Sequence, residues 1–126
     1  DILVMGDMVR LEQVMVNLLS NAMQAMEGCT LKRIEIDCQL TDRLVCMNIR
    51  DYGPGIDPAA LGRLFEPFYT TKSAGEGLGL GLSISKRIVE SLGGELSAAN
   101  HPEGGACFRV CLLRVDSHAS DLVVGV

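Results

Sequence analysis

The 126-residue chain has no tryptophan, only 4% aromatic residues and no cluster of lysine or arginine, and its formal net charge is -5. Proteins that bind nucleic acid or an anionic membrane surface normally carry a basic patch, so this composition argues against nucleic-acid binding. No segment has the length and hydrophobicity of a membrane span or the pattern of a signal peptide. We therefore expect a domain that does not itself insert into a membrane.

The cysteines do not have the spacing of a metal site. They are odd in number and form no CxxC pair: Cys29, Cys38, Cys46, Cys107 and Cys111. Structural zinc sites use closely spaced pairs of ligands, and secreted disulfide scaffolds usually contain an even number of cysteines. Cys107 and Cys111 would face the same way on a strand, too far apart along it to form a disulfide. We expect reduced thiols and a cytoplasmic location.

The length and the hydrophobic content of 48% indicate one domain with a single core. The chain begins with DILVMGD, without an initiator methionine, so we expect it to be part of a longer protein. We place the domain at residues 1–115. The tail at residues 116–126 has too little pattern to assign.

Apolar residues recur at steps of three and four along residues 8–26, which predicts an amphipathic helix. Asn17, Asn21 and Gln24 fall along one edge of its apolar face. These amides are either solvated surface groups or oxygen donors for Mg²⁺, which prefers hard oxygen ligands. The predicted buried face consists of Leu11, Val14, Met15, Leu18, Leu19, Ala22, Met23 and Met26.

Residues 32–40 and 43–51 form a predicted β-hairpin in which Leu40 pairs with Arg43. This register places the apolar residues of both strands on one face and puts Asp51 at the end of that face. A carboxylate at this position either caps the following turn or points into a pocket, where it accepts a hydrogen bond from an exocyclic amine.

The predicted elements together form a two-layer α/β sandwich, with a mixed sheet of about five strands under about three helices. Besides the helix and the hairpin, they are an edge strand at residues 2–5 followed by Asp7 as a helix N-cap, a helical turn from Asp57, a helix at residues 80–92 with Ile84, Ile88 and Leu92 inward, and strands at residues 95–99 and 106–113.

Residues 51–82 hold seven of the fourteen glycines and end in GLGLGL, where the second long helix begins. Glycines spaced two apart leave backbone N–H groups uncovered, and the start of a helix adds the positive end of its dipole. This layout predicts a phosphate-binding site for a nucleotide, with residues 73–77 as a mobile lid. The Walker motif GxxxxGK[ST] and the dinucleotide spacing GxGxxG are both absent.

Four segments resemble, in order and spacing, the N, G1, F and G2 boxes of the catalytic ATP-binding domain of sensor histidine kinases: NLLSNAMQAM, DYGPGI, LFEPFYTTK and GEGLGLGLSISKRIVESLGGEL. GGACFRV resembles the closing strand of that domain, so the similarity covers residues 4–113. The N box is similar to those of nitrogen-sensor and dicarboxylate-sensor kinases. The resemblance implies the Bergerat ATP-binding fold, Mg-ATP as ligand and phosphoryl transfer to a histidine.

The resemblance also implies the residues of the site. Asn21 would hold Mg²⁺ against the triphosphate with Asn17 beside it, and Asp51 would receive the adenine amino group. Arg63 and Lys72 are the other catalytic candidates, near the γ-phosphate. The remaining implied nucleotide contacts are Gln24, Gly53, Gly55, Thr71, Lys72, Gly77, Leu78, Gly79, Leu80, Gly81 and Ala106.

The sequence departs from the family pattern at two positions. Gln24 stands where many members have a lysine, so a phosphate contact is lost unless Arg63 or Lys72 replaces it. Ala106 stands where a threonine is frequent, which removes a hydroxyl from the adenine pocket. The related ATPases of the gyrase and heat-shock chaperone type place a glutamate, their general base, where this chain has Asn17, so we expect ATP to be held for transfer rather than hydrolysed quickly.

The resemblance places the acceptor histidine on a separate dimerisation domain, since neither His101 nor His118 has the surroundings of an acceptor. It further implies a homodimeric parent kinase at the bacterial inner membrane, with this domain in the cytoplasm and a response regulator as an indirect partner. Two alternatives stay open: a serine-directed anti-sigma kinase or related ATPase of the same fold, and a non-catalytic nucleotide-binding docking module.

Overall fold

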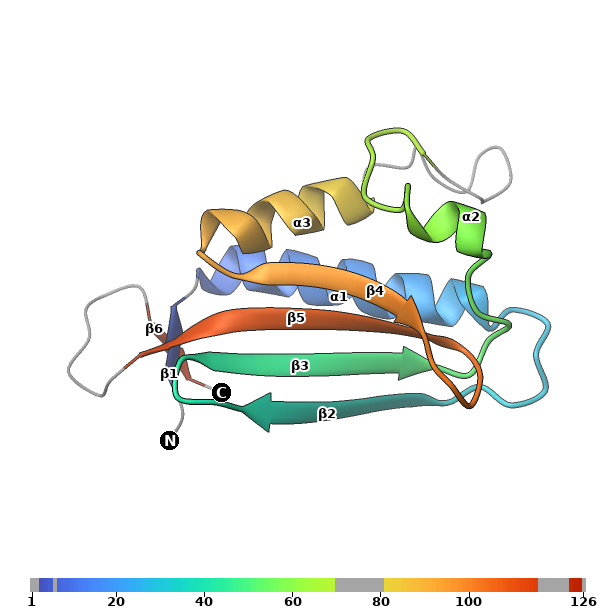
Figure 1. Cartoon of the computed structure of the whole chain (residues 1–126), viewed down its shortest axis with the longest axis horizontal. Helices are drawn as coiled ribbons and strands as arrows, with labels where there is room; N and C mark the ends of the chain where they lie inside the picture. Colours follow the sequence, from blue (N-terminus) through green and yellow to red (C-terminus); the bar gives the residue numbers. More distant parts are fainter. Residues whose placement is uncertain (1–2, 6, 70–80, 116–122, 126) are drawn as a thin grey trace.

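The computed structural model, which describes residues 3–5, 7–69, 81–115 and 123–125, confirms the two-layer α/β sandwich (Figure 1). The helices are α1 (Met8–Ala25), α2 (Pro58–Leu61) and α3 (Gly81–Ser91). The strands are β1 (Leu3–Met5), β2 (Ile34–Leu40), β3 (Leu44–Asp51), β4 (Glu95–Asn100), β5 (Ala106–Val115) and β6 (Val123–Gly125).

The sheet follows the order β2-β3-β5-β1-β6, and β4 also pairs with β5. Every pairing between the described strands is antiparallel, so the expected mixed character of the sheet is wrong, while the expected number of about five strands is close to the six described. The reason lies in β5, which separates β3 from β4. The two strands joined by the long helical connection are therefore not neighbours, and no parallel pair forms between them.

The sequence had suggested that the first strand lies at an edge of the sheet, and this prediction is wrong. β1 lies between β5 and β6, and Val4 pairs with Arg114 on one side and Val124 on the other. β6 belongs to the tail, where the sequence showed no assignable pattern. A strand of three residues is too short to show a period in its sequence, and it forms here because β1 offers unpaired backbone groups.

The β2–β3 hairpin has a longer turn than predicted, since Leu40 pairs with Val45 rather than with Arg43. The Thr41 N–H donates to the Leu44 carbonyl over 2.9 Å, and the Leu44 N–H donates back to Thr41 Oγ1 over 2.9 Å. A threonine hydroxyl that binds its own turn thus replaces the two-residue loop. Because the shift is two residues, each side chain keeps its predicted face, and Asp51 still points to the helices.

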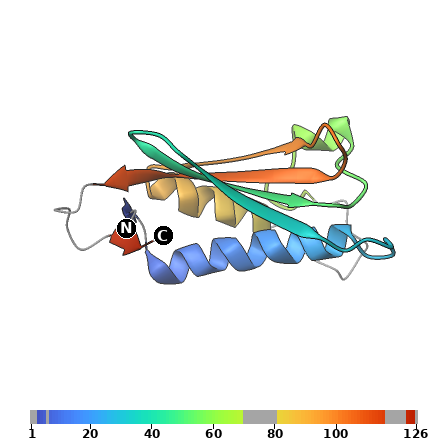
Figure 2. The same cartoon turned by 90° about the horizontal axis from the view of Figure 1, so that it is seen from below.

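Both long helices pack on one face of the sheet, as Figure 2 shows, and the core lies between the layers. The N-cap prediction is confirmed, since Asp7 Oδ1 accepts from the N–H groups of Val9 and Arg10. The prediction of burial is wrong for two residues: Met23 is 63% exposed and Ile84 is 45% exposed. The most deeply buried side chains are Val14, Leu18, Cys46, Ile49, Ser85, Val89 and Leu96.

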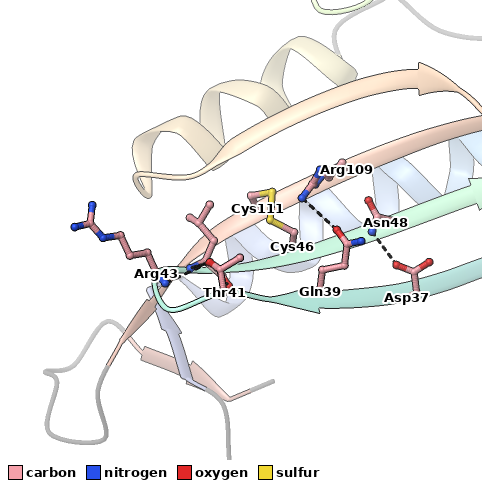
Figure 3. The surroundings of a disulfide bond; sticks show 9 residues. Asp37, Gln39, Thr41, Arg43, Cys46, Asn48, Arg109 and Cys111 are labelled. Carbon is pink, nitrogen blue, oxygen red and sulfur yellow. Dashed lines mark hydrogen bonds between the residues drawn. A yellow bond between two sulfur atoms is a disulfide. The ribbon is translucent and has the colours of Figure 1, made fainter.

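The described segments place no helix on the other face of the sheet, where Cys46 and Cys111 form a disulfide (Figure 3). The two residues are direct partners on β3 and β5, with their Cα atoms 4.0 Å apart. The expectation of five reduced thiols is therefore wrong for this pair. The sequence could not pair two residues 65 positions apart without the strand register; Cys29, Cys38 and Cys107 are free.

Candidate functional site

Asp51 ends β3 on its helix-facing side and is only 2% exposed, as the strand pattern predicted. Its Oδ1 atom accepts from the Gly53 N–H over 2.9 Å and from the Ala106 N–H over 3.3 Å. The carboxylate therefore caps the following turn, which was one of the two alternatives from the sequence. Among the described residues, none forms a hydrogen bond to the second oxygen, Oδ2. That oxygen keeps its capacity to accept from a ligand.

Glycines surround this carboxylate because the backbone passes too close for side chains. A Cβ on Gly53 would lie 2.7 Å from the Ala25 carbonyl, and one on Gly105 would overlap the Asp51 carbonyl. Gly105 also has a φ of +83°, a conformation that favours glycine. The expected nucleotide contact of Gly53 stays a prediction, and the sequence reasoning missed Gly105.

The three amides of α1 have different surroundings. Asn17 is half-buried, and its Nδ2 donates to Ser85 Oγ over 3.1 Å and to the Gly81 carbonyl over 3.4 Å. Asn21, one turn later, is half-buried, and no hydrogen bond between described residues involves its side chain. Gln24 is exposed. Asn17 thus ties α1 to α3, while the Asn21 amide oxygen is available as a hard ligand.

Arg63 lies in the turns after α2 and is engaged with its own loop. Its guanidinium contacts both carboxylate oxygens of Glu66 at 3.3–3.4 Å and lies 4.4 Å from the ring centre of Tyr69. The predicted contact with a γ-phosphate would have to compete with this ion pair. Exposed pairs of this kind contribute little free energy, so the competition is not prohibitive.

Several predicted contacts fall outside the described residues, so their positions stay predictions. They are Thr71, Lys72, Gly77, Leu78, Gly79 and Leu80. Gly81 is described: it is the first residue of α3, and its carbonyl receives the Asn17 amide. A Cβ at this position would lie 3.8 Å from the Asn17 side chain, so the start of α3 sits against the predicted site.

A groove of about 420 Å³ runs along α1 and the start of α3. Val9, Val16 and Ile84 contribute exposed apolar side chains to it, and the half-buried Asn17 is part of its lining. Ile84 was predicted to face the core, but Ser85 takes the inward position because its hydroxyl accepts the Asn17 amide. The full lining is Val9, Glu12, Gln13, Val16, Asn17, Gly81 and Ile84.

The sequence reasoning also missed Asn100, which ends β4. Its side chain forms two hydrogen bonds of 2.7 Å with the backbone of Ile56, in the loop that follows Asp51. The available signal was an asparagine at a strand end before the turn-rich PEGG segment, a residue type that often binds neighbouring backbone groups.

In the described part of the chain, no three His, Cys, Asp or Glu side chains gather as they would around a metal ion. Within these same residues, no helix is long and apolar enough to cross a membrane. One thiol is perturbed: burial raises the pKa of Cys107, and the nearby Asp37 carboxylate raises it further.

The family model for histidine kinase-, DNA gyrase B- and HSP90-like ATPases matches residues 6–116, which include every element of the site described above. The chain belongs to this ATPase family. As a member, it is a nucleotide-binding domain, and the resemblance of its four boxes to sensor histidine kinases is confirmed by relatives that carry that name.

Among the curated relatives of this ATPase domain, the two-component sensor PprA of Pseudomonas aeruginosa is 45% identical over 107 residues, which are 80% of this chain and 12% of PprA. The C4-dicarboxylate transport sensor protein DctB of the same organism is 43% identical over 105 residues, 82% of this chain and 17% of DctB. The similarity to dicarboxylate-sensor kinases is thus confirmed. The domain spans less than a fifth of the length of either relative.

Solved structures agree with the fold. The mycobacterial sensor histidine kinase MprB superposes on the ATPase domain with a TM-score of 0.77 at 28% identity, covering 88% of this chain and 76% of that one. Full-length ShkA, crystallised in complex with AMPPNP, gives a TM-score of 0.72 at 30% identity, covering 87% of this chain and 22% of ShkA. The predicted histidine-kinase catalytic fold is confirmed.

Proposed function

We propose that this domain binds Mg-ATP between α1, the loop after β3 and the start of α3, and presents the γ-phosphate to a histidine on a separate phosphoacceptor domain. The observation that carries the proposal is the Asp51 carboxylate, buried at the end of β3 with Oδ1 held by two backbone N–H groups and Oδ2 without a partner among described residues.

Asp51 supplies the base-binding end of the site. Two N–H donors on Oδ1 hold the Asp51 carboxylate in one orientation. An exocyclic amine therefore binds to it without the entropic cost of ordering the carboxylate. Adenine presents such an amine, whereas guanine presents a carbonyl oxygen at the corresponding place, which would be repelled by the carboxylate. The site therefore favours ATP over GTP.

Asn21 supplies the metal-binding end. Its side chain is half-buried on α1 and has no hydrogen bond with the described residues, and an amide oxygen fits the preference of Mg²⁺ for hard oxygen ligands. The ion, when bound, would neutralise charge on the phosphates. The backbone N–H groups that precede α3, from Gly77 to Gly81, are proposed to receive the phosphates, together with Thr71, Lys72 and Arg63.

The site is suited to transfer rather than to hydrolysis. Asn17 stands where an activating carboxylate would have to be, and its Nδ2 is committed to Ser85 and Gly81. An amide does not accept a proton from water at neutral pH, so no group at this position generates a nucleophile. Catalysis would then rest on positioning and on charge neutralisation, with the nucleophile supplied by the acceptor histidine.

The names of the relatives support the assignment of partners. PprA is a two-component sensor and DctB is a transport sensor protein, and the chain matches only a small part of each. We infer that this domain works within a homodimeric kinase, in the cytoplasm beside the inner membrane. Its phosphoacceptor domain would receive the phosphoryl group and pass it to a response regulator.

Calorimetric titration of the domain with AMPPNP, with and without Mg²⁺ and beside GTP, tests the binding step. We expect binding that depends on the metal and favours the adenine nucleotide. Transfer is tested by incubating the domain with radiolabelled ATP and a separately purified phosphoacceptor domain of a relative. An acid-labile label on the acceptor supports the kinase. A label stable to acid would indicate a serine-directed kinase, and binding without transfer to any acceptor would favour a docking module.

A further inference from the structure

Asn100 binds the backbone of one residue in the loop after β3 through both halves of its amide. Asn100 Oδ1 accepts from the Ile56 N–H, and Asn100 Nδ2 donates to the Ile56 carbonyl, each over 2.7 Å. The two residues are 44 positions apart. A single side chain here acts as the partner that a neighbouring strand would otherwise provide.

The loop is packed closely against this side chain. Gly55, the residue before Ile56, has a φ of +86°, and a Cβ at this position would lie 2.9 Å from Asn100 Oδ1. The same Cβ would lie 3.7 Å from the Gly105 carbonyl. The loop therefore runs over Asn100 and the turn that joins β4 to β5, with no room for a side chain between them.

The same turn holds the Asp51 carboxylate. Asn100 pairs with Ala106 across β4 and β5, and the Ala106 N–H donates to Asp51 Oδ1. The other N–H on Oδ1 comes from Gly53, which lies three residues before Ile56 in the clamped loop. Asn100 thus joins the two segments that fix the direction of the carboxylate, the one by its strand pairing and the other by its side chain.

We propose that Asn100 is a positioning residue for base recognition, an inference that rests on the proposed nucleotide site. It holds residues 53–56 against the end of β4. The N–H groups of Gly53 and Ala106 then both donate to Asp51 Oδ1, and Oδ2 stays directed at the exocyclic amine of the base. Asn100 acts through the Ile56 backbone and does not contact the nucleotide.

The chemistry explains why asparagine is needed. The Ile56 backbone requires an acceptor and a donor side by side, and a primary amide offers both in one plane. Aspartate keeps the acceptor for the N–H but turns a second acceptor toward the Ile56 carbonyl. Alanine provides neither group and leaves the loop without its anchor.

The test uses Asn100→Ala and Asn100→Asp, with Asn48→Ala as the matched control. Asn48 makes one hydrogen bond of 2.8 Å to Asp37 on the opposite face of the sheet, away from the loop. Affinities for ATP and GTP are measured by calorimetry with Mg²⁺. We expect Asn100→Ala to weaken ATP about tenfold while GTP changes little, so that the ATP-to-GTP ratio falls. The ATP-to-GTP ratio of Asn100→Asp should lie between those of the wild type and Asn100→Ala, and Asn48→Ala should leave the ratio unchanged.

Amide hydrogen exchange of Ile56 provides a readout that needs no ligand. The wild-type Ile56 N–H should be protected, and Asn100→Ala should remove this protection while the β3 and β5 amides keep theirs. An unchanged ATP-to-GTP ratio in Asn100→Ala, or an unprotected Ile56 amide in the wild type, overturns the inference. A wild-type domain that binds no nucleotide overturns the proposed function and with it the positioning role, an outcome recognised because the wild type itself fails. If Asn100→Ala does not fold, Asn100→Asp and the wild-type exchange decide.

Discussion

Asn17 on α1 donates a hydrogen bond of 3.1 Å to the hydroxyl of Ser85 on α3, a residue with no exposed surface. The pair joins the two helices that lie over the sheet, at the point where α3 begins. A polar contact inside an otherwise apolar layer fixes which faces meet, because the fully buried Ser85 hydroxyl would otherwise lack a partner among the described residues. The first asparagine of the N box therefore has a structural role besides the one proposed at the nucleotide.

Ser85→Ala should lower the free energy of unfolding by about 1–2 kcal/mol, because the Asn17 amide loses its buried acceptor and keeps only the longer contact to the Gly81 carbonyl. Urea unfolding followed by circular dichroism measures the change. Ser97→Ala, on the exposed side of β4, is the control and should change stability by less than about 0.5 kcal/mol. Equal losses in the two variants would show that the interhelical contact contributes nothing.

Asp51→Asn should weaken ATP binding by about 1–3 kcal/mol, because the charged acceptor for the base is replaced by an amide that presents a donor to the adenine amine. The control is Asp37→Asn, an exposed carboxylate of β2 whose hydrogen bond to Asn48 lies on the opposite face of the sheet. Calorimetry measures the ATP affinity of both variants and of the wild type, and Asp37→Asn should bind ATP as the wild type does. If ATP binds Asp51→Asn as tightly as the wild type, the base is not read by this carboxylate.

Gly105→Ala should destabilise the fold more than Gly104→Ala. Both glycines have positive φ values, +83° and +109°, so alanine is strained at either position and costs about 1–2 kcal/mol. A Cβ on Gly105 would also overlap the Asp51 carbonyl, whereas one on Gly104 meets nothing within 4 Å. Unfolding in urea separates the two effects. Similar losses in both variants would mean that the turn moves away from β3 at no cost.

The sequence predicted every described element except β6, and most of the core, because those depend on local patterns. The apolar period of α1, the Asp7 cap and the alternation along β3 each have a signal within a few residues, and each is confirmed. The face of Asp51 was predicted even though the hairpin register was wrong, because an error of two residues leaves the alternation unchanged.

Apart from the hairpin register, the main errors concern contacts between segments far apart in the chain. The outward position of Ile84 follows from the bond of Ser85 to Asn17, 68 residues away, and the disulfide follows from the pairing of β3 with β5. The hydrogen bonds of Asn100 to Ile56 depend on the same packing. Local periodicity contains no information on these pairs, so the contacts that support the site from distant segments were not predictable from one sequence.

The Cys107 thiol should react with iodoacetamide only at higher pH than the same thiol in the urea-unfolded chain. Burial raises its pKa, and the Asp37 carboxylate adds to the shift, so the reactive thiolate forms later as the pH rises. Mass spectrometry of the Cys107 peptide over a pH series gives both midpoints. Restricted access would slow the reaction at every pH, whereas the raised pKa moves the midpoint. A folded-state midpoint at or below that of the unfolded chain contradicts the shift.

Reduction of the Cys46–Cys111 disulfide should lower the free energy of unfolding by about 4 kcal/mol. The bridge joins residues 65 positions apart, and cross-linking a loop of that length restricts the unfolded chain by roughly this amount. The loop includes α2, α3 and β4, so the site elements lose the constraint together. Urea unfolding with and without dithiothreitol measures the effect, and the double variant Cys46→Ala with Cys111→Ala is the control. The reductant should not change the stability of that variant, whereas equal sensitivity in both proteins, or two free thiols at these positions in the untreated wild type, would exclude the bridge as a source of stability.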